Sequence, residues 1–284
     1  MARTARRLGA VVAALVCVVA LLVVLAVIII KSIPNHQPLP GEQRCVATAA
    51  DQSVAVDTEQ AHYAALIAGI SVRKGLAPRA ASIALATAYQ ESNLRNLDHG
   101  DRDSVGLFQQ RPSMGWGTEK QLMNPYYATT RFYRALIKIH GWEKGDITEI
   151  AQKIQISGYP DAYRDHEADA RVLASVLTGQ SPAGIRCLIR DQRPGDVSGL
   201  IKDLRKTYQL KPKHSGSVIT ISAGSTTLAW SYAQFAVANA RQYGVARVEV
   251  GSHSYQVDNR ILAEWKTTQD SIGAKSVKIT TRAS

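Results

Sequence analysis

Residues 80–92 read AASIALATAYQES, and their alanine- and leucine-rich composition favours an α-helix. Apolar side chains fall on every side of such a helix, so the pattern predicts a helix buried in a core. Glu91 is the only charged residue of this segment and lies near its end. Because burial disfavours the charged form of a carboxyl group and raises its pKa, Glu91 is a candidate general acid.

A polar loop over residues 98–105 follows this helix and leads into Gly106-Leu107-Phe108-Gln109. The chain here resembles the lysozyme-like superfamily, in particular soluble lytic transglycosylases and goose-type lysozymes. The first family has a helix ending in Glu-Ser and then Gly-Leu-Met-Gln, and Glu91-Ser92 precedes residues 106–109 at the same separation. The second has Gly-Asp-Arg before that motif, where this chain has residues 100–102. The resemblance covers roughly residues 59 to 178 and implies a mainly α domain.

The resemblance implies cleavage of the β-1,4 bond between N-acetylmuramic acid and N-acetylglucosamine in peptidoglycan, with Glu91 as acid and then base. In transglycosylases the N-acetyl group and C6 hydroxyl of the substrate replace an enzyme nucleophile and water, which yields a 1,6-anhydro sugar. Goose-type lysozymes use water positioned by acidic residues, and Asp101 matches one of these. A second acidic position of that family is occupied here by Arg111, which weakens the hydrolase interpretation without eliminating it.

The same resemblance assigns substrate contacts to residues around Glu91. Gly106 would let the backbone approach a sugar, Gln109 could hydrogen-bond one, and Trp116 could stack on one. An ordinary turn glycine and a loop-anchoring tryptophan are the simpler alternatives. The full set of expected substrate-binding residues is Ser92, Gly106, Leu107, Gln109, Gln155 and Trp116.

Residues 154–158 read IQISG, where transglycosylases have Ala-Tyr-Asn-Ala-Gly. Gln155 is the candidate replacement for the tyrosine hydroxyl, and the loss of that tyrosine brings catalysis itself into question. Two interpretations stay open: a peptidoglycan-cleaving enzyme, and an inactive peptidoglycan-binding or wall-assembly factor. A further alternative for Glu91 is a purely structural ion pair with Arg95 or Arg102.

The N-terminal region predicts a membrane anchor. Residues 8–30 are apolar or small and carry no charge, which is long enough to span the roughly 30 Å hydrocarbon core as a helix. Arginines at positions 3, 6 and 7 place the N-terminus in the cytoplasm by the positive-inside rule, and the rest of the chain outside. A cleaved signal peptide is the competing interpretation.

The chain has three cysteines, and Cys17 falls within the predicted span. Cys45 and Cys187 bracket the lysozyme-like region and are predicted to form a disulfide, with two free thiols as the alternative. The net charge of +11 over 284 residues indicates anionic surroundings, either acidic wall polymers or lipid head groups. We expect no nucleic-acid partner, because no basic-aromatic motif is present.

Breaks in the pattern at proline, glycine and polar residues suggest that the chain has six parts. They are residues 1–7, the span 8–30, a linker 31–58, the lysozyme-like domain 59–190, a second linker 191–216 with a short helix, and a small α/β module 217–284. In that module we expect strands at 217–221, 245–250 and 276–280 and a helix at 228–243. The predicted fold is thus a mainly α lysozyme-like domain after one transmembrane helix, with a small C-terminal α/β module.

No metal or cofactor is expected. The seven histidines show no close pairing, and the sequence around His166 lacks the second histidine of a zinc-binding helix. Asp98, Asp101 and Asp103 do not have the offsets of an EF-hand calcium loop.

Overall fold

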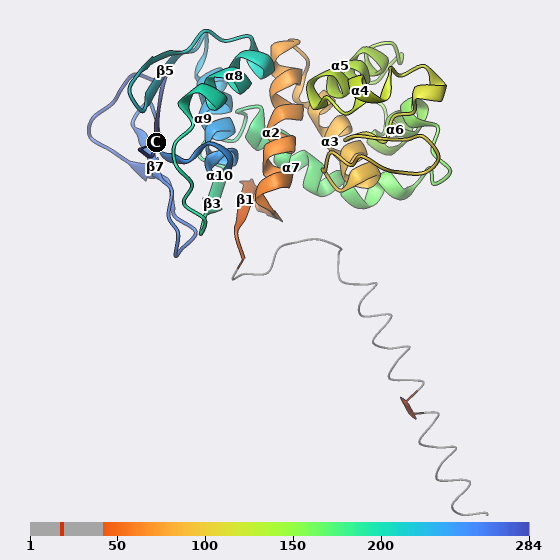
Figure 1. Cartoon of the computed structure of the whole chain (residues 1–284), viewed down its shortest axis with the longest axis horizontal. Coiled ribbons are helices and arrows are strands. Elements are labelled where there is room, and N and C mark those ends of the chain that lie inside the picture. Colours follow the sequence, from red (N-terminus) through yellow and green to blue (C-terminus); the bar gives the residue numbers. More distant parts are fainter. Residues whose placement is uncertain (1–17, 20–41, 284) are drawn as a thin grey trace, which may run out of the picture. The chain divides into compact units, whose positions relative to one another are not determined.

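The computed structural model describes residues 18–19 and 42–283, and residues 42–283 belong to one compact unit (Figure 1). The first part of that unit contains β1 (Arg44–Ala49), β2 (Gln52–Val56), α2 (Thr58–Arg73), α3 (Pro78–Ser92), η1 (Pro112–Met114), α4 (Glu119–Leu122), α5 (Pro125–Leu136), α6 (Ile147–Gln155), η2 (Ala162–His166) and α7 (Glu167–Leu177). The second part contains β3 (Ile185–Leu188), α8 (Val197–Tyr208), β4 (Lys213–Ser215), β5 (Val218–Ser222), α9 (Thr226–Ala238), α10 (Ala240–Tyr243), β6 (Val245–Val250), β7 (His253–Gln256), β8 (Lys266–Thr267) and β9 (Ser276–Thr281).

The prediction of a mainly α fold is wrong, because two antiparallel sheets accompany the helices. One sheet has the strand order β2-β1-β3, and the other has the order β4-β5-β9-β6-β7-β8. The first sheet was missed because β1 and β2 are short and lie in the predicted linker, while the third strand, β3, comes more than a hundred residues later in the chain. Local sequence carries no signal for a pairing over that distance.

Helix α2 lies between the two halves of the compact unit, with α3 on one side and α8 and α9 on the other (Figure 1). Its start is fixed by a capping box, in which the Asp57 carboxylate accepts from the backbone N–H of Gln60 and the Gln60 side chain accepts from the backbone N–H of Asp57. Gln60 then reaches across to the end of α3, where its Nε2 donates to Asn93 Oδ1 at 2.9 Å. The first half is therefore built around α2 and α3.

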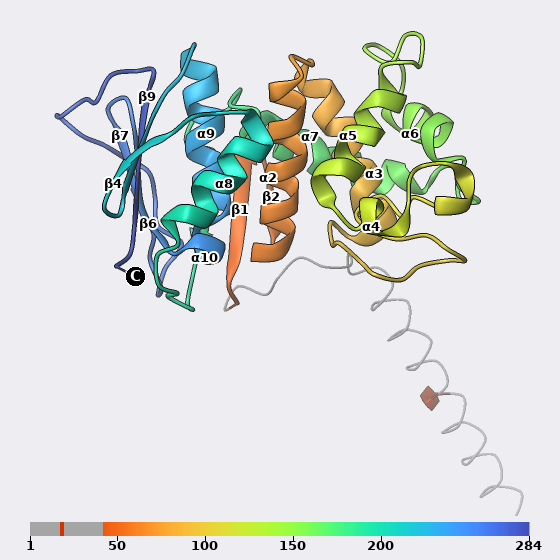
Figure 2. The same ribbon diagram turned by 45° about the horizontal axis from the view of Figure 1, so that its top comes forward.

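The six-stranded sheet packs against α9, which contacts β6 and β9 and also α2 (Figure 2). Strands β5, β6 and β9 lie where alternating apolar residues predicted them. The predicted helix over 228–243 is instead two helices, α9 and α10, which are separated at Asn239. Through α9 the C-terminal sheet shares the core with the first half.

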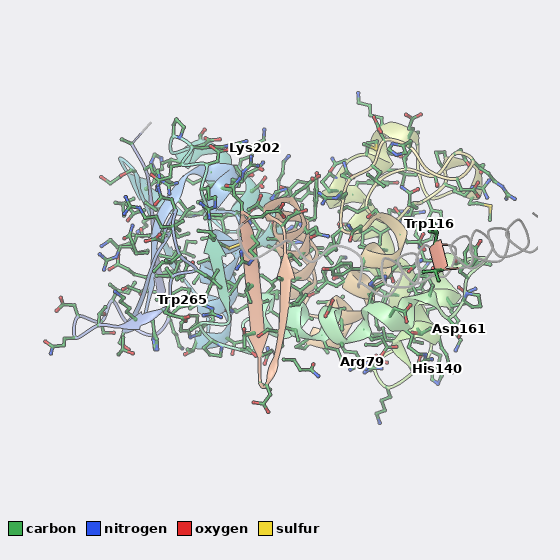
Figure 3. All side chains as sticks on the ribbon, turned by 90° about the horizontal axis from the view of Figure 1, so that it is seen from below. Arg79, Trp116, His140, Asp161, Lys202 and Trp265 are labelled. Carbon is green, nitrogen blue, oxygen red and sulfur yellow. A yellow bond between two sulfur atoms is a disulfide. The ribbon has the colours of Figure 1, made fainter. Side chains whose placement is uncertain are left out.

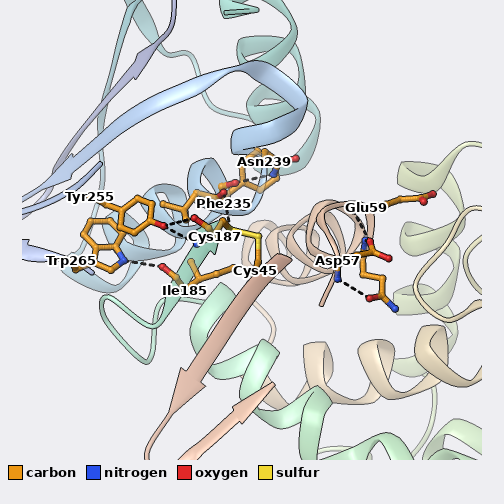
Figure 4. Close-up of a disulfide and its surroundings, with 11 residues drawn as sticks. Cys45, Asp57, Glu59, Ile185, Cys187, Phe235, Asn239, Tyr255 and Trp265 are labelled. Atoms are coloured by element: carbon orange, nitrogen blue, oxygen red, sulfur yellow. Dashed lines mark hydrogen bonds between the residues drawn. A yellow bond between two sulfur atoms is a disulfide. The ribbon is translucent and has the colours of Figure 1, made fainter. Parts of the chain in front are cut away.

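The predicted disulfide between Cys45 and Cys187 is confirmed (Figure 4). The two residues are directly opposite each other in the β1–β3 pair, and both are fully buried. The Tyr255 hydroxyl donates to the Cys187 carbonyl at 3.0 Å and accepts from the Cys187 N–H at 2.7 Å. The bond thus ties the start of the compact unit to the point where the chain enters its second half.

The predicted span at residues 8–30 lies outside the described residues, except for Val18 and Val19. Among the residues that the structure describes, no helix combines the length and the apolar character needed to cross a bilayer. This finding contradicts the predicted single-pass membrane location.

Candidate active site

Helix α3 carries Glu91 in its last turn. The helix starts with Pro78 at its first position, where the missing N–H costs no hydrogen bond, and ends at Asn93 in a left-handed conformation. Its residues 80–89 are all buried, as predicted from their composition. Glu91 is the first side chain after this run that carries a charge, and it is only partly exposed.

Two side chains influence the carboxyl group of Glu91. The Tyr163 hydroxyl donates to Glu91 Oε1 at 2.6 Å. Burial is the largest influence on the pKa of Glu91 and raises it above its ordinary value, while the side chains of Tyr163 and Gln155 lower it. Among the described residues, no acidic or basic side chain contributes to this shift. Glu91 is thus a half-buried, hydrogen-bonded carboxyl group whose protonated form is favoured.

Tyr163 is the site residue that the sequence analysis missed. It lies in the short helix η2, is fully buried, and has a raised pKa because of burial and the adjacent Glu91. The predicted tyrosine position was the one aligned with the family motif, at Gln155, whereas the hydroxyl comes from a residue further along the chain. Two tyrosines, Tyr159 and Tyr163, follow shortly after that departure from the motif, and nothing in the sequence distinguishes them.

Gln155, the last residue of α6, also contacts the segment after the polar loop. Its Nε2 donates to the Phe108 carbonyl at 2.7 Å. Phe108 is fully buried and stacks on Phe132 with 4.6 Å between ring centroids. Gln155 therefore ties the end of α6 to a buried part of the core.

Ser92 and Leu107 lie inside the protein. The Ser92 hydroxyl donates to the Leu107 carbonyl at 2.7 Å and to the Ala88 carbonyl at 3.0 Å, and both Ser92 and Leu107 are buried. These hydrogen bonds hold the Gly106–Gln109 segment against the end of α3. In this structure both residues support the site rather than line an open surface.

Gly106 has a φ of +79°, and a Cβ at this position would lie 2.6 Å from the Leu122 carbonyl oxygen. Glycine is required there for both reasons. The Gln109 side chain accepts from the Ser104 hydroxyl at 2.9 Å and donates to the carbonyls of Gly106 and His99 at 3.2 and 3.3 Å. Gln109 thus closes the polar loop on itself.

The acidic residues of the polar loop differ in their surroundings. The side chain of Asp101 is 92% exposed, and its nearest cation, Arg102, is 3.9 Å away. Asp103 accepts from Arg111 Nε and from the backbone N–H of Ser113, each at 2.7 Å, and these contacts lower its pKa. Arg111 is thus part of a loop-fixing ion pair.

Trp116 is partly buried and packs against the core. Its carbonyl accepts from Arg131 Nε at 3.0 Å, which anchors the loop that carries it. Figure 3 shows Trp116 on the half of the molecule that contains the first part of the fold. Its ring lines a small cleft of about 250 Å³ together with Arg131, Arg134 and Lys138.

Arg95 does not pair with Glu91. Its guanidinium group forms ion pairs with Asp57 and with Glu59, the latter at 2.6 Å. Since Arg102 pairs with Asp101, the purely structural ion pair considered for Glu91 is not formed with either arginine.

Within residues 18–19 and 42–283 there is no group of three or more His, Cys, Asp or Glu side chains that could hold a metal ion. The chain matches no known protein-family model and no curated protein sequence.

Proposed function

We propose that this protein cleaves peptidoglycan glycan strands as a lytic transglycosylase, with Glu91 as the single acid and base. The observation that carries the proposal is the hydrogen-bonded, half-buried carboxyl group at the end of α3, with the Tyr163 hydroxyl 2.6 Å from Oε1. A raised pKa keeps such a group protonated closer to neutral pH, as a proton donor to a leaving glycosidic oxygen requires.

The surroundings of Asp101 favour the anhydro-forming reaction over hydrolysis. Glycosidases that use water or an enzyme nucleophile need a paired carboxylate roughly 5–10 Å away. Asp101 is the candidate for that role, but its side chain is almost fully exposed and bonded to none of the groups around Glu91. In the proposed reaction Glu91 protonates the leaving oxygen and then accepts the proton of the substrate's own C6 hydroxyl, which closes the anhydro ring.

A second candidate is an inactive protein that retains the fold for glycan binding. It is favoured by the internal hydrogen bonds of Ser92 and Gln109, because both side chains are committed to the loop. This candidate predicts binding of glycan strands without any change in their length.

The experiment incubates the full chain with purified peptidoglycan and identifies the products by mass spectrometry. Glu91→Gln should lower the rate by roughly 10²–10⁴-fold, because it removes the titrating proton while preserving the shape of the side chain. The matched control is Glu149→Gln, which changes an exposed glutamate of α6 and should leave the rate unchanged. Asp101→Asn should leave anhydro products and their rate largely intact.

The outcomes separate the candidates. Wild-type rates in Glu91→Gln would remove Glu91 from the reaction. Products without the anhydro ring, lost in Asp101→Asn, would replace the transglycosylase by a hydrolase. Binding without cleavage by the folded wild-type protein, on several peptidoglycans, would establish the inactive glycan-binding candidate instead.

A further inference from the structure

A basic cleft of about 1070 Å³ lies between α8 and the end of β9. It is on the opposite side of α2 from α3, and Figure 3 shows Lys202 and Trp116 on different halves of the molecule. The cleft is therefore separate from the surroundings of Glu91. Its charged and titratable lining residues are Asp196, Lys202, Arg205, Lys206, His214 and Arg282.

Three of the cations lie on one face of α8. Lys202, Arg205 and Lys206 have the i, i+3, i+4 spacing of neighbours on a helix surface, and all three are exposed. Within the part of the chain that the structure describes, none of them forms an ion pair. The positions of Arg205 and Lys206 in the last turn also suit the helix dipole, but that account does not apply to Lys202.

The one acidic residue among the described lining residues is already occupied. Asp196 caps the start of α8, where its Oδ1 accepts from the Gly199 N–H at 2.8 Å and the Ser198 hydroxyl at 2.9 Å. It lies at the opposite end of the helix from Arg205 and Lys206. Asp196 therefore pairs with none of these three cations, and Lys206 Nζ lies over the Tyr126 ring, 4.9 Å from its centroid.

Arg282 contributes an unsatisfied donor at the opposite wall. Its Nη1 atom is buried and has no hydrogen-bond acceptor among the described residues. The residue as a whole is partly exposed and lines the cleft, so its guanidinium group adds a positive charge to this wall. The arginine fork is well matched to phosphate oxygens.

The remaining walls distinguish between classes of anion. Val197 and Ile201 supply apolar surface beside the cations, which suits the carbon chain of a polyol. The lining contains no Phe, Tyr or Trp, whereas proteins that bind single-stranded nucleic acid stack its bases on aromatic side chains. We propose that this cleft binds a linear polymer of phosphodiester-linked polyols, at a site independent of Glu91.

The test measures binding of fluorescently labelled poly(glycerol phosphate) to the full chain by anisotropy at low salt. Removing three positive charges by Lys202→Gln, Arg205→Gln and Lys206→Gln should weaken binding by roughly tenfold or more and flatten its salt dependence, because fewer counterions are released. Arg282→Gln alone should also weaken binding. Neutral dextran should not bind, and inorganic phosphate should compete only at much higher concentration.

The matched control removes three exposed lysines outside the cleft, by Lys120→Gln, Lys144→Gln and Lys275→Gln. It changes the net charge equally and should bind almost as well as the wild type. Equal loss in this control would overturn the site, as would no binding of the polymer by the wild-type protein. Binding of oligothymidylate as tight as that of the polymer would replace it by a nucleic-acid site.

Folding is checked by circular dichroism, and the single variants Lys202→Gln and Arg205→Gln decide the matter if the triple variant unfolds. Each should show a smaller loss in the same direction, and unchanged binding in both would overturn the proposal. Cleavage of polymer-free peptidoglycan should be the same in the triple variant and the wild type, so this test stands apart from that of Glu91.

Discussion

Replacing Tyr163 by phenylalanine isolates the contribution of one hydroxyl to the candidate acid. The side chain is fully buried and keeps its ring, so the substitution removes little more than the 2.6 Å hydrogen bond to Glu91 Oε1. That bond stabilises the ionised carboxylate, and it is one of the two interactions that oppose the effect of burial on the pKa of Glu91. Tyr163→Phe should therefore raise that pKa further.

The size of the shift follows from the strength of the bond. A hydrogen bond to a charged group contributes about 1.5–3 kcal/mol. Since one pKa unit corresponds to about 1.36 kcal/mol, the pKa of Glu91 should rise by about one to two units, or less if water replaces the hydroxyl. Because the proton donor is the protonated form, the alkaline limb of the rate profile should move to higher pH by the same amount.

The pKa is measured directly, without any assumption about activity, from the ¹³C carboxyl resonance of Glu91, assigned by its absence in Glu91→Gln. The control is Tyr133→Phe, which also removes a buried tyrosine hydroxyl, in this case one that donates to the Ile67 carbonyl at 3.0 Å. It should cost about 1 kcal/mol of stability and leave the titration of Glu91 in place. An unchanged or lowered pKa of Glu91 in Tyr163→Phe would refute the reasoning.

The same shift has a consequence for stability. The pKa of Glu91 in the folded protein lies above its ordinary value of 4.5, so the folded state binds more protons than the unfolded state between the two values. The stabilisation from Glu91 is therefore fully present below pH 4.5 and is lost as the pH rises through the folded-state pKa. In urea titrations across this range, Glu91→Gln should remove the loss and Tyr163→Phe should enlarge it.

Two further changes test the framework that holds the site. Changing both Cys45 and Cys187 to serine should lower the free energy of unfolding by about 2–5 kcal/mol, measured by urea denaturation, and an unchanged midpoint would show that the bond adds nothing. Gly106→Ala should destabilise the protein by clearly more than the roughly 1 kcal/mol expected of Gly75→Ala. The reason is that a Cβ at Gly106 would meet the Leu122 carbonyl, whereas a Cβ at Gly75 would have no atom within 4 Å. Equal losses in the two alanine variants would contradict the close contact.

The elements that could be predicted from the sequence are those whose signal is local. The core helix over residues 80–92 and the strands β5, β6 and β9 follow from composition and alternation within a few residues. The β1–β3 pair depends on residues that are distant in the chain, and each strand alone is too short to stand out. The predicted disulfide was the one indication that residues 45 and 187 meet, but a single bond between two side chains does not determine the direction or register of the strands around them.

The residues of the candidate site also differ in whether a local signal in the sequence predicts them. Glu91 is a candidate from the sequence because a lone carboxyl group in an apolar helix is conspicuous, and its partial burial follows from that composition. Ser92 is next to it in the chain and Gln109 follows the polar loop, but their hydrogen bonds depend on backbone geometry that the residue types do not encode. Tyr163 was missed because the path of the chain from α6 to η2 cannot be read from periodicity.

The path from α6 to η2 bears on the choice between an enzyme and a binding protein. The departure from the transglycosylase motif at Gln155 was the reason to doubt catalysis, since it removes a tyrosine hydroxyl. In the structure Gln155 donates to the Phe108 carbonyl and lowers the pKa of Glu91, and the next helix brings a tyrosine hydroxyl to that carboxyl group. The changed motif therefore does not leave Glu91 without a tyrosine, and it ceases to favour inactivity. What separates the two candidates is then whether Glu91 exchanges its proton with a bound glycan, which is the property that the cleavage rate of Glu91→Gln on peptidoglycan measures.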